Sequence, residues 1–106
     1  MSDDFVKVGE LDEIARIAAS AVAVADNMVA LFNIDGDLFA IDDSCLRCGA
    51  SVASGELRGH YATCSRCDWE YEVATGAVRG VPQLHTGRFA VKIVDTEVMV
   101  SRRPMR

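Results

Sequence analysis

The chain has 106 residues, half of them hydrophobic, and a formal net charge of −5, with a sequence pI near 4.8. This size predicts a single domain over residues 1–106 with its own hydrophobic core. The acidic balance argues against a nucleic-acid partner, because Lys and Arg contacts to phosphates dominate that affinity. No basic signal segment or bilayer-length apolar run occurs, so we expect a cytoplasmic protein with reduced thiols.

The apolar pattern predicts a chain that is nearly all β, because short alternating segments are separated by turn residues. The elements expected in chain order are an edge strand at 5–8, a polar turn at 10–13, a mainly extended stretch at 14–25, a hairpin turn at 26–27, a buried strand at 28–34, a tight turn at 35–36, a return strand at 38–41, a half-exposed strand at 69–73, a turn at 74–76, and strands at 89–94 and 98–100. Two cysteine-containing loops interrupt this series between 41 and 69.

The four cysteines of the chain form two C-x-x-C pairs, Cys45-Leu46-Arg47-Cys48 and Cys64-Ser65-Arg66-Cys67. Two intervening residues let both thiolates of a pair reach one small ion, and a connection over residues 49–63 lets the second pair complete a tetrahedron. Disulfides or a dithiol redox couple are disfavoured, since the chain shows no secretory segment and no strand-to-helix context at either pair. The spacing therefore predicts a metal site at Cys45, Cys48, Cys64 and Cys67.

The residues around these pairs resemble a Rieske-type ferredoxin over residues 5–100. The family motif Cys-x-His-x-Gly corresponds here to Cys45-Leu46-Arg47-Cys48-Gly49, and Cys-x-x-His corresponds to Cys64-Ser65-Arg66-Cys67. The family's following aromatic, acid and Thr-Gly correspond to Tyr71, Glu72, Thr75 and Gly76. The resemblance implies an all-β, Rieske-like sandwich or partly open barrel, with an inserted metal-binding subdomain of two cysteine knuckle loops at about residues 43–69.

This sequence departs from the family at both histidine ligands. Arg47 occupies the first histidine position and Cys67 the second, while Cys48 lies one residue beyond the first. His60 and His85 lie outside the loops, and we expect both to be surface or turn residues. A centre with two histidine ligands is therefore excluded.

Three metal centres remain open. A 2Fe-2S cluster with four thiolates follows from the resemblance, and its potential would fall from the Rieske range toward about −400 mV because thiolates replace neutral imidazoles. A mononuclear, rubredoxin-like iron and a single zinc follow from the spacing, since paired knuckles converge on one ion. The resemblance favours 2Fe-2S over mononuclear iron, and zinc is the alternative metal.

Several neighbours of the cysteines are expected to support the centre. Arg47 and Arg66 occupy equivalent positions inside the two knuckles, where a guanidinium would offset the negative charge of four thiolates. Gly49 would let backbone N–H groups approach sulfur. Trp69 and Tyr71 are interpreted as packing residues first.

The resemblance implies an electron carrier. A reductase would donate electrons to it, and it would then dock on an oxygenase or on the catalytic component of a reductase. The sequence contains no catalytic constellation, so we do not expect an enzyme. The alternative functions are a non-redox accessory or binding module with a structural zinc bound by four cysteines, and a small non-catalytic subunit of a larger enzyme. Protein redox partners are expected, and membrane partners are not.

Overall fold

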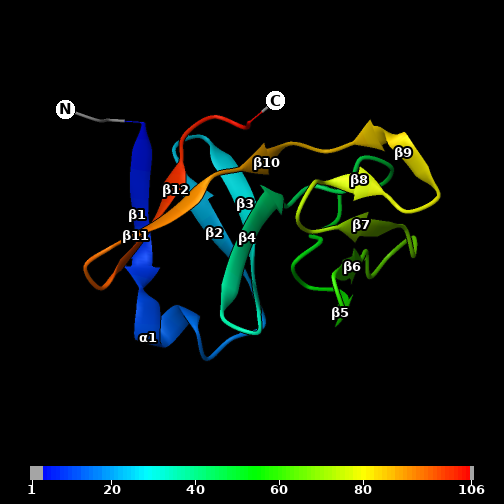
Figure 1. Cartoon of the computed structure of the whole chain (residues 1–106). Helices are drawn as coiled ribbons and strands as arrows, with labels where there is room; N and C mark the ends of the chain where they lie inside the picture. Colours follow the sequence, from blue (N-terminus) through cyan, green and yellow to red (C-terminus); the bar gives the residue numbers. More distant parts are fainter. Residues whose placement is uncertain (1–3, 106) are drawn as a thin grey trace.

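The computed structural model describes residues 4–105, so residues 1–3 and residue 106 of the predicted domain lie outside the described part. The strands form three antiparallel sheets (Figure 1). The first sheet contains β1 (Phe5–Glu10), β12 (Glu97–Ser101) and β11 (Val91–Val94), in that order. The second contains β10 (Arg88–Phe89), β4 (Asp37–Asp42), β3 (Asn27–Ile34) and β2 (Ala19–Val24).

The third sheet is inserted between β4 and β10 in the sequence and lies at one end of the molecule (Figure 1). It contains β5 (Glu56–Arg58), β6 (Tyr61–Thr63), β7 (Glu70–Glu72), β8 (Ala77–Val78) and β9 (Val81–His85). The nearly all-β class with an inserted cysteine-loop subdomain is therefore confirmed.

The hairpin turns follow from the residues that tolerate a positive φ. Asp35 and Gly36 join β3 to β4 with φ values of 52° and 91°, as the sequence predicts. The turn between β2 and β3 was expected at 26–27, and that prediction is wrong by one residue. Val24 pairs with Asn27, so the two loop residues are Ala25 and Asp26, and Ala25 takes a φ of 54°.

Three other local expectations need correction. The extended stretch predicted from residue 14 begins as a strand only at Ala19, because the short helix α1 (Leu11–Ile14) and a turn precede it. The strand expected at 89–94 divides at Ala90, since β10 pairs with β4 whereas β11 pairs with β12. β9 was not expected, and its side chains are all exposed at the edge of the third sheet.

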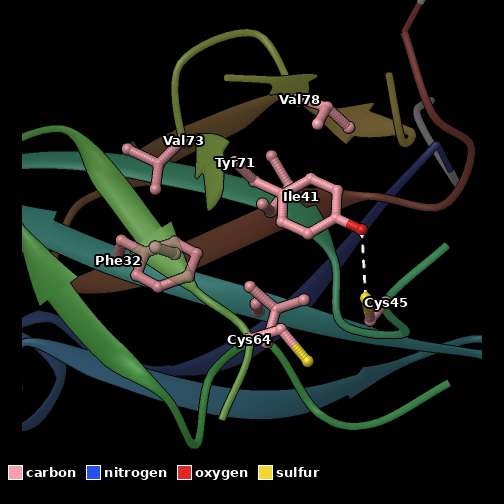
Figure 2. Packing of buried hydrophobic residues seen from close by; sticks show 10 residues of the cluster. Phe32, Ile41, Cys45, Cys64, Tyr71, Val73 and Val78 are labelled. Carbon is pink, nitrogen blue, oxygen red and sulfur yellow. Dashed lines mark hydrogen bonds between the residues drawn. The ribbon is translucent and has the colours of Figure 1, made fainter. Parts of the chain in front are cut away.

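β3 is buried on both faces and separates two hydrophobic clusters. Val29 and Leu31 point into a cluster between the first two sheets, which also contains Val24, Ala40, Phe89, Val98 and Val100. Ala30 and Phe32 point into a second cluster, shown in part in Figure 2, with Ile41, Cys45, Val52, Ala62, Cys64, Tyr71, Val73 and Val78. The first cysteine of each pair is therefore part of a packed core and not of a free loop.

None of the helical structure within residues 4–105 has the length and apolarity that a membrane crossing requires.

Candidate metal centre

The first cysteine loop leaves the end of β4 and is closed by the carboxylate of Asp43. This side chain is 6% exposed, and its Oδ1 accepts hydrogen bonds from Ser51 Oγ at 2.9 Å and from the Ala53 N–H at 2.8 Å. A second closure comes from the Val52 N–H, which donates to the Asp43 carbonyl at 2.7 Å. Asp43 thus holds both ends of the loop together and has a structural role.

The second cysteine loop is the tip of a hairpin between β6 and β7. Thr63 and Glu70 are paired across the two strands, so the loop residues Cys64 to Trp69 project from a fixed base. Gly55 makes room for this base, because a Cβ at that position would lie 1.7 Å from the Thr63 carbonyl oxygen. The close approach of the segment at 52–55 to the hairpin therefore requires glycine.

The two loops have the same backbone hydrogen bonds. In the first, the Gly49 N–H donates to the Cys45 carbonyl at 2.9 Å, and in the second the Asp68 N–H donates to the Cys64 carbonyl at 3.1 Å. Gly49 and Asp68 both take a positive φ, of 78° and 63°. Gly49 thus occupies the left-handed turn position expected from the sequence, and Asp68 occupies the same position without being glycine.

The loops bring the four cysteine sulfurs together. All four Sγ atoms lie within 4.8 Å of one another. The Sγ atoms of Cys45 and Cys67 are 3.6 Å apart, and those of Cys48 and Cys64 are 3.4 Å apart. These separations are far longer than the roughly 2.05 Å of a disulfide, and all four cysteines are free thiols. Cys45 and Cys64 are buried, whereas Cys48 and Cys67 are half-buried.

Tyr71 of β7 connects the hydrophobic core to this cluster of sulfurs (Figure 2). Its side chain is fully buried, and its hydroxyl lies 3.2 Å from Cys45 Sγ. The Leu46 N–H donates to the same hydroxyl oxygen at 2.9 Å, so the phenolic hydrogen is free to be donated to sulfur. Tyr71 was expected from the sequence to be a packing residue, and its contact with Cys45 was not predicted. Its place at the buried position of an alternating strand beside the second loop was the one available signal.

The thiols differ in their readiness to ionise. Burial raises the pKa of the Cys45 thiol, but hydrogen bonds from the Tyr71 hydroxyl and from the backbone N–H groups of Cys48 and Arg47 outweigh burial and lower the pKa to about 6. At Cys67 the backbone N–H of Trp69 lowers the pKa, but burial and the neighbouring thiols together raise it to about 12. Burial and the contact with Cys45 also raise the pKa of Tyr71, which therefore remains a hydrogen-bond donor.

The other residues that the sequence singled out are not members of the group of four cysteines. Arg47 is exposed and lies over the ring of half-buried Trp69, with 5.8 Å from its guanidinium carbon to the ring centroid. Arg66 is exposed in the second loop. His60 lies in the turn between β5 and β6, edge-on to Phe39. The last candidate, His85, is exposed on β9.

Comparison with known proteins identifies relatives along nearly the full chain. A model of the Rieske [2Fe-2S] domain family matches residues 4–96. The biphenyl dioxygenase ferredoxin subunit of Pseudomonas sp. (strain KKS102) is 31% identical over 91% of this chain and 90% of its own length. The ferredoxin component of the naphthalene 1,2-dioxygenase/salicylate 5-hydroxylase systems of Ralstonia sp is 26% identical over 94% of this chain and 97% of its own length.

The same fold occurs in a solved ferredoxin structure. The ferredoxin of carbazole 1,9a-dioxygenase from Nocardioides aromaticivorans IC177 superposes on this chain with a TM-score of 0.87 and is 22% identical in sequence. The match covers 95% of this chain and 100% of that chain. The Rieske-like arrangement of the sheets expected from the sequence is therefore confirmed.

The residues at the site do not fit the histidine-containing cluster of Rieske proteins. Two histidines replace two cysteines on one iron of that centre. Among residues 4–105, the potential metal-ligand group that includes the cysteines contains no histidine, since its members are Cys45, Cys48, Cys64 and Cys67. Four convergent thiols are instead a donor set for iron or zinc.

Proposed function

The chain belongs to the Rieske [2Fe-2S] domain family, and from this premise we propose that it is a small electron-transfer component of an oxygenase or reductase system. In this proposal the whole chain is one domain, and the loops at about residues 43–69 carry a redox centre. A reductase donates single electrons to the protein, which docks on an oxygenase or on the catalytic component of a reductase and passes them on. Iron bound at the site would supply the one-electron couple.

One observation supports this proposal above the others. Four sulfurs converge within 4.8 Å in a chain that covers 97% of the length of a relative named as the ferredoxin component of dioxygenase systems. We therefore propose Cys45, Cys48, Cys64 and Cys67 as the metal ligands.

The surroundings of the sulfurs suit electron transfer. Cys45 and Cys64 are anchored in the core, whereas Cys48 and Cys67 are only half-buried. A partner that docks over the loops would thus approach the site through Cys48 and Cys67. Arg47 and Arg66 are exposed beside these sulfurs, where their charges offset four thiolates, and Gly49 provides the left-handed turn of the first loop.

Redox spectroscopy tests this function. We expect anaerobically purified protein to show sulfur-to-iron charge-transfer bands that bleach with dithionite and return on oxidation. The Cys48→Ser variant should lose these bands. Leu46→Ser is the matched control, since it gives the first loop the Cys-Ser-Arg-Cys sequence of the second and retains all four thiols. A colourless protein that carries zinc after growth with added iron would contradict electron transfer and support the structural-zinc alternative.

A further inference from the structure

The geometry of the sulfurs points to a centre smaller than the one for which the family is named. We propose that Cys45, Cys48, Cys64 and Cys67 hold a single metal ion in a tetrahedron of four thiolates, and not a cluster of two irons and two sulfides. This inference rests on the ligand set of the proposed function. It concerns the number of metal ions, which that function leaves open.

The separations between the sulfurs match one tetrahedron. A metal–sulfur bond of about 2.3 Å gives a tetrahedron whose sulfurs are about 3.8 Å apart. The two shortest separations here are 3.4 Å and 3.6 Å, and none of the others exceeds 4.8 Å. Two irons with bridging sulfides between them would require ligands of different irons to stand farther apart than the ligands of one ion.

The identity of the closest sulfurs strengthens this argument. In the family arrangement, Cys45 and Cys64 would share one iron, while Cys48 and Cys67 would replace the histidines on the other. Cys45 and Cys67 would then belong to different irons, as would Cys48 and Cys64. These are the two pairs in closest contact, at 3.6 Å and 3.4 Å. The loops are therefore closed over the space that a second iron and two sulfides would occupy.

The symmetry of the loops explains why they close on one point. Cys45 and Cys64 each donate their own N–H to the carbonyl of the residue five positions later, Ala50 at 2.9 Å and Trp69 at 2.8 Å. Both loops also contain the same turn, with the positive φ at Gly49 and at Asp68. Each loop thus presents its two sulfurs in the same way, and two such loops facing each other define four corners around one centre. The Cys-x-His-x-Gly loop of the family lacks the second cysteine that this arrangement requires.

The test is the composition of the bound centre. The protein is purified anaerobically from iron-supplemented cells, and a second sample is reconstituted with ferrous iron and sulfide. We expect one metal ion per chain, no acid-labile sulfide, native mass spectra with the added mass of a single ion, and no metal–metal scattering in X-ray absorption. Two irons and two sulfides per chain in either sample would overturn the proposal.

A variant with the family's ligand pattern serves as the control for cluster assembly. The triple substitution Arg47→His, Cys48→Ser and Cys67→His restores Cys-x-His-x-Gly and Cys-x-x-His in this chain. We expect this variant to retain sulfide under conditions in which the natural sequence retains none, because its ligands no longer form two equivalent pairs. Sulfide in the natural sequence at the level of the variant would contradict a single-ion site.

The outcomes separate this inference from the proposed function. One iron with reversible oxidation supports both. One zinc after growth with iron supports the single-ion site but refutes the electron carrier. A binuclear cluster refutes the single-ion site and leaves the electron carrier standing, and cysteines found joined as disulfides without metal would refute both.

Discussion

Tyr71 is the residue at which the core and the proposed metal centre meet. Its ring is fully buried, and its hydroxyl lies between the Leu46 N–H and Cys45 Sγ. A hydrogen bond to a thiolate ligand favours the more negatively charged, reduced form of the centre, and such bonds are among the determinants of iron–sulfur potentials. At a metal centre that uses Cys45 as a ligand, Tyr71 would therefore be a positioning residue that also tunes the centre through this thiolate.

Replacing this tyrosine should lower the reduction potential. We expect Tyr71→Phe to shift the potential down by about 60 mV, which corresponds to about 1.4 kcal/mol for one electron. Protein-film voltammetry measures the shift. Tyr61→Phe on the adjacent strand is the control, because the described contact of Tyr61 is with the guanidinium of Arg79. Equal potentials in the Tyr71 variant and the natural protein would show that its hydroxyl does not donate to sulfur.

β3 links the proposed metal centre to the rest of the sandwich. Neighbouring residues of this strand belong to different hydrophobic clusters, because successive side chains of a strand point to opposite faces. Phe32 packs in the cluster that contains Cys45 and Cys64, whereas Leu31 packs in the cluster between the first two sheets. Both side chains are 1% exposed. Two adjacent substitutions can therefore probe the two clusters separately.

Truncation of either Phe32 or Leu31 should destabilise the protein, but only truncation of Phe32 should increase the rate of metal release. We expect Phe32→Ala to cost about 3–5 kcal/mol and Leu31→Ala about 2–5 kcal/mol of unfolding free energy, as large-to-small core substitutions do. Phe32→Ala should also accelerate metal release to a chelator, since the cavity it leaves opens in the cluster that contains Cys45 and Cys64. Denaturant titration and chelator kinetics measure the two effects. Identical release rates in both variants would mean that the clusters are not independent.

At the scale of the whole molecule, the core between the first two sheets contains no cysteine. Val24, Leu31, Phe89, Val98 and Val100 are at most 6% exposed there. Small zinc-dependent domains, in contrast, unfold without metal because their ligands replace a core. The first two sheets of this chain should therefore hold together when the metal is removed.

Metal removal should reduce hydrogen-exchange protection in the cysteine loops and leave the protection of the first two sheets unchanged. After chelation under reducing conditions, we expect hydrogen exchange to accelerate at the Cys45 and Cys64 amides, which are bonded within the loops. Amides of β3 and β12 should stay protected, because their pairing does not involve the site. Loss of protection across the whole chain would show that the metal is required for folding.

Some features of this fold follow from local sequence and others do not. The meander and the cysteine loops were predictable because they depend on local spacing, turn residues and alternation. The division at Ala90 was not, since continuous apolar residues hide the change of partner from β4 to β12. β9 was missed because its exposed residues and Pro82 carry no alternating signal.

The sequence by itself determined the candidate donor atoms: four thiols in two equivalent pairs, with no histidine in either loop. Those conclusions depend only on residue identity and spacing, which do not change on folding. The tertiary structure alone decided that Cys45 meets Cys67, that Cys48 meets Cys64, and that Tyr71 reaches Cys45. Such contacts between distant segments depend on how β6 and β7 pair and on how the third sheet packs against β3 and β4.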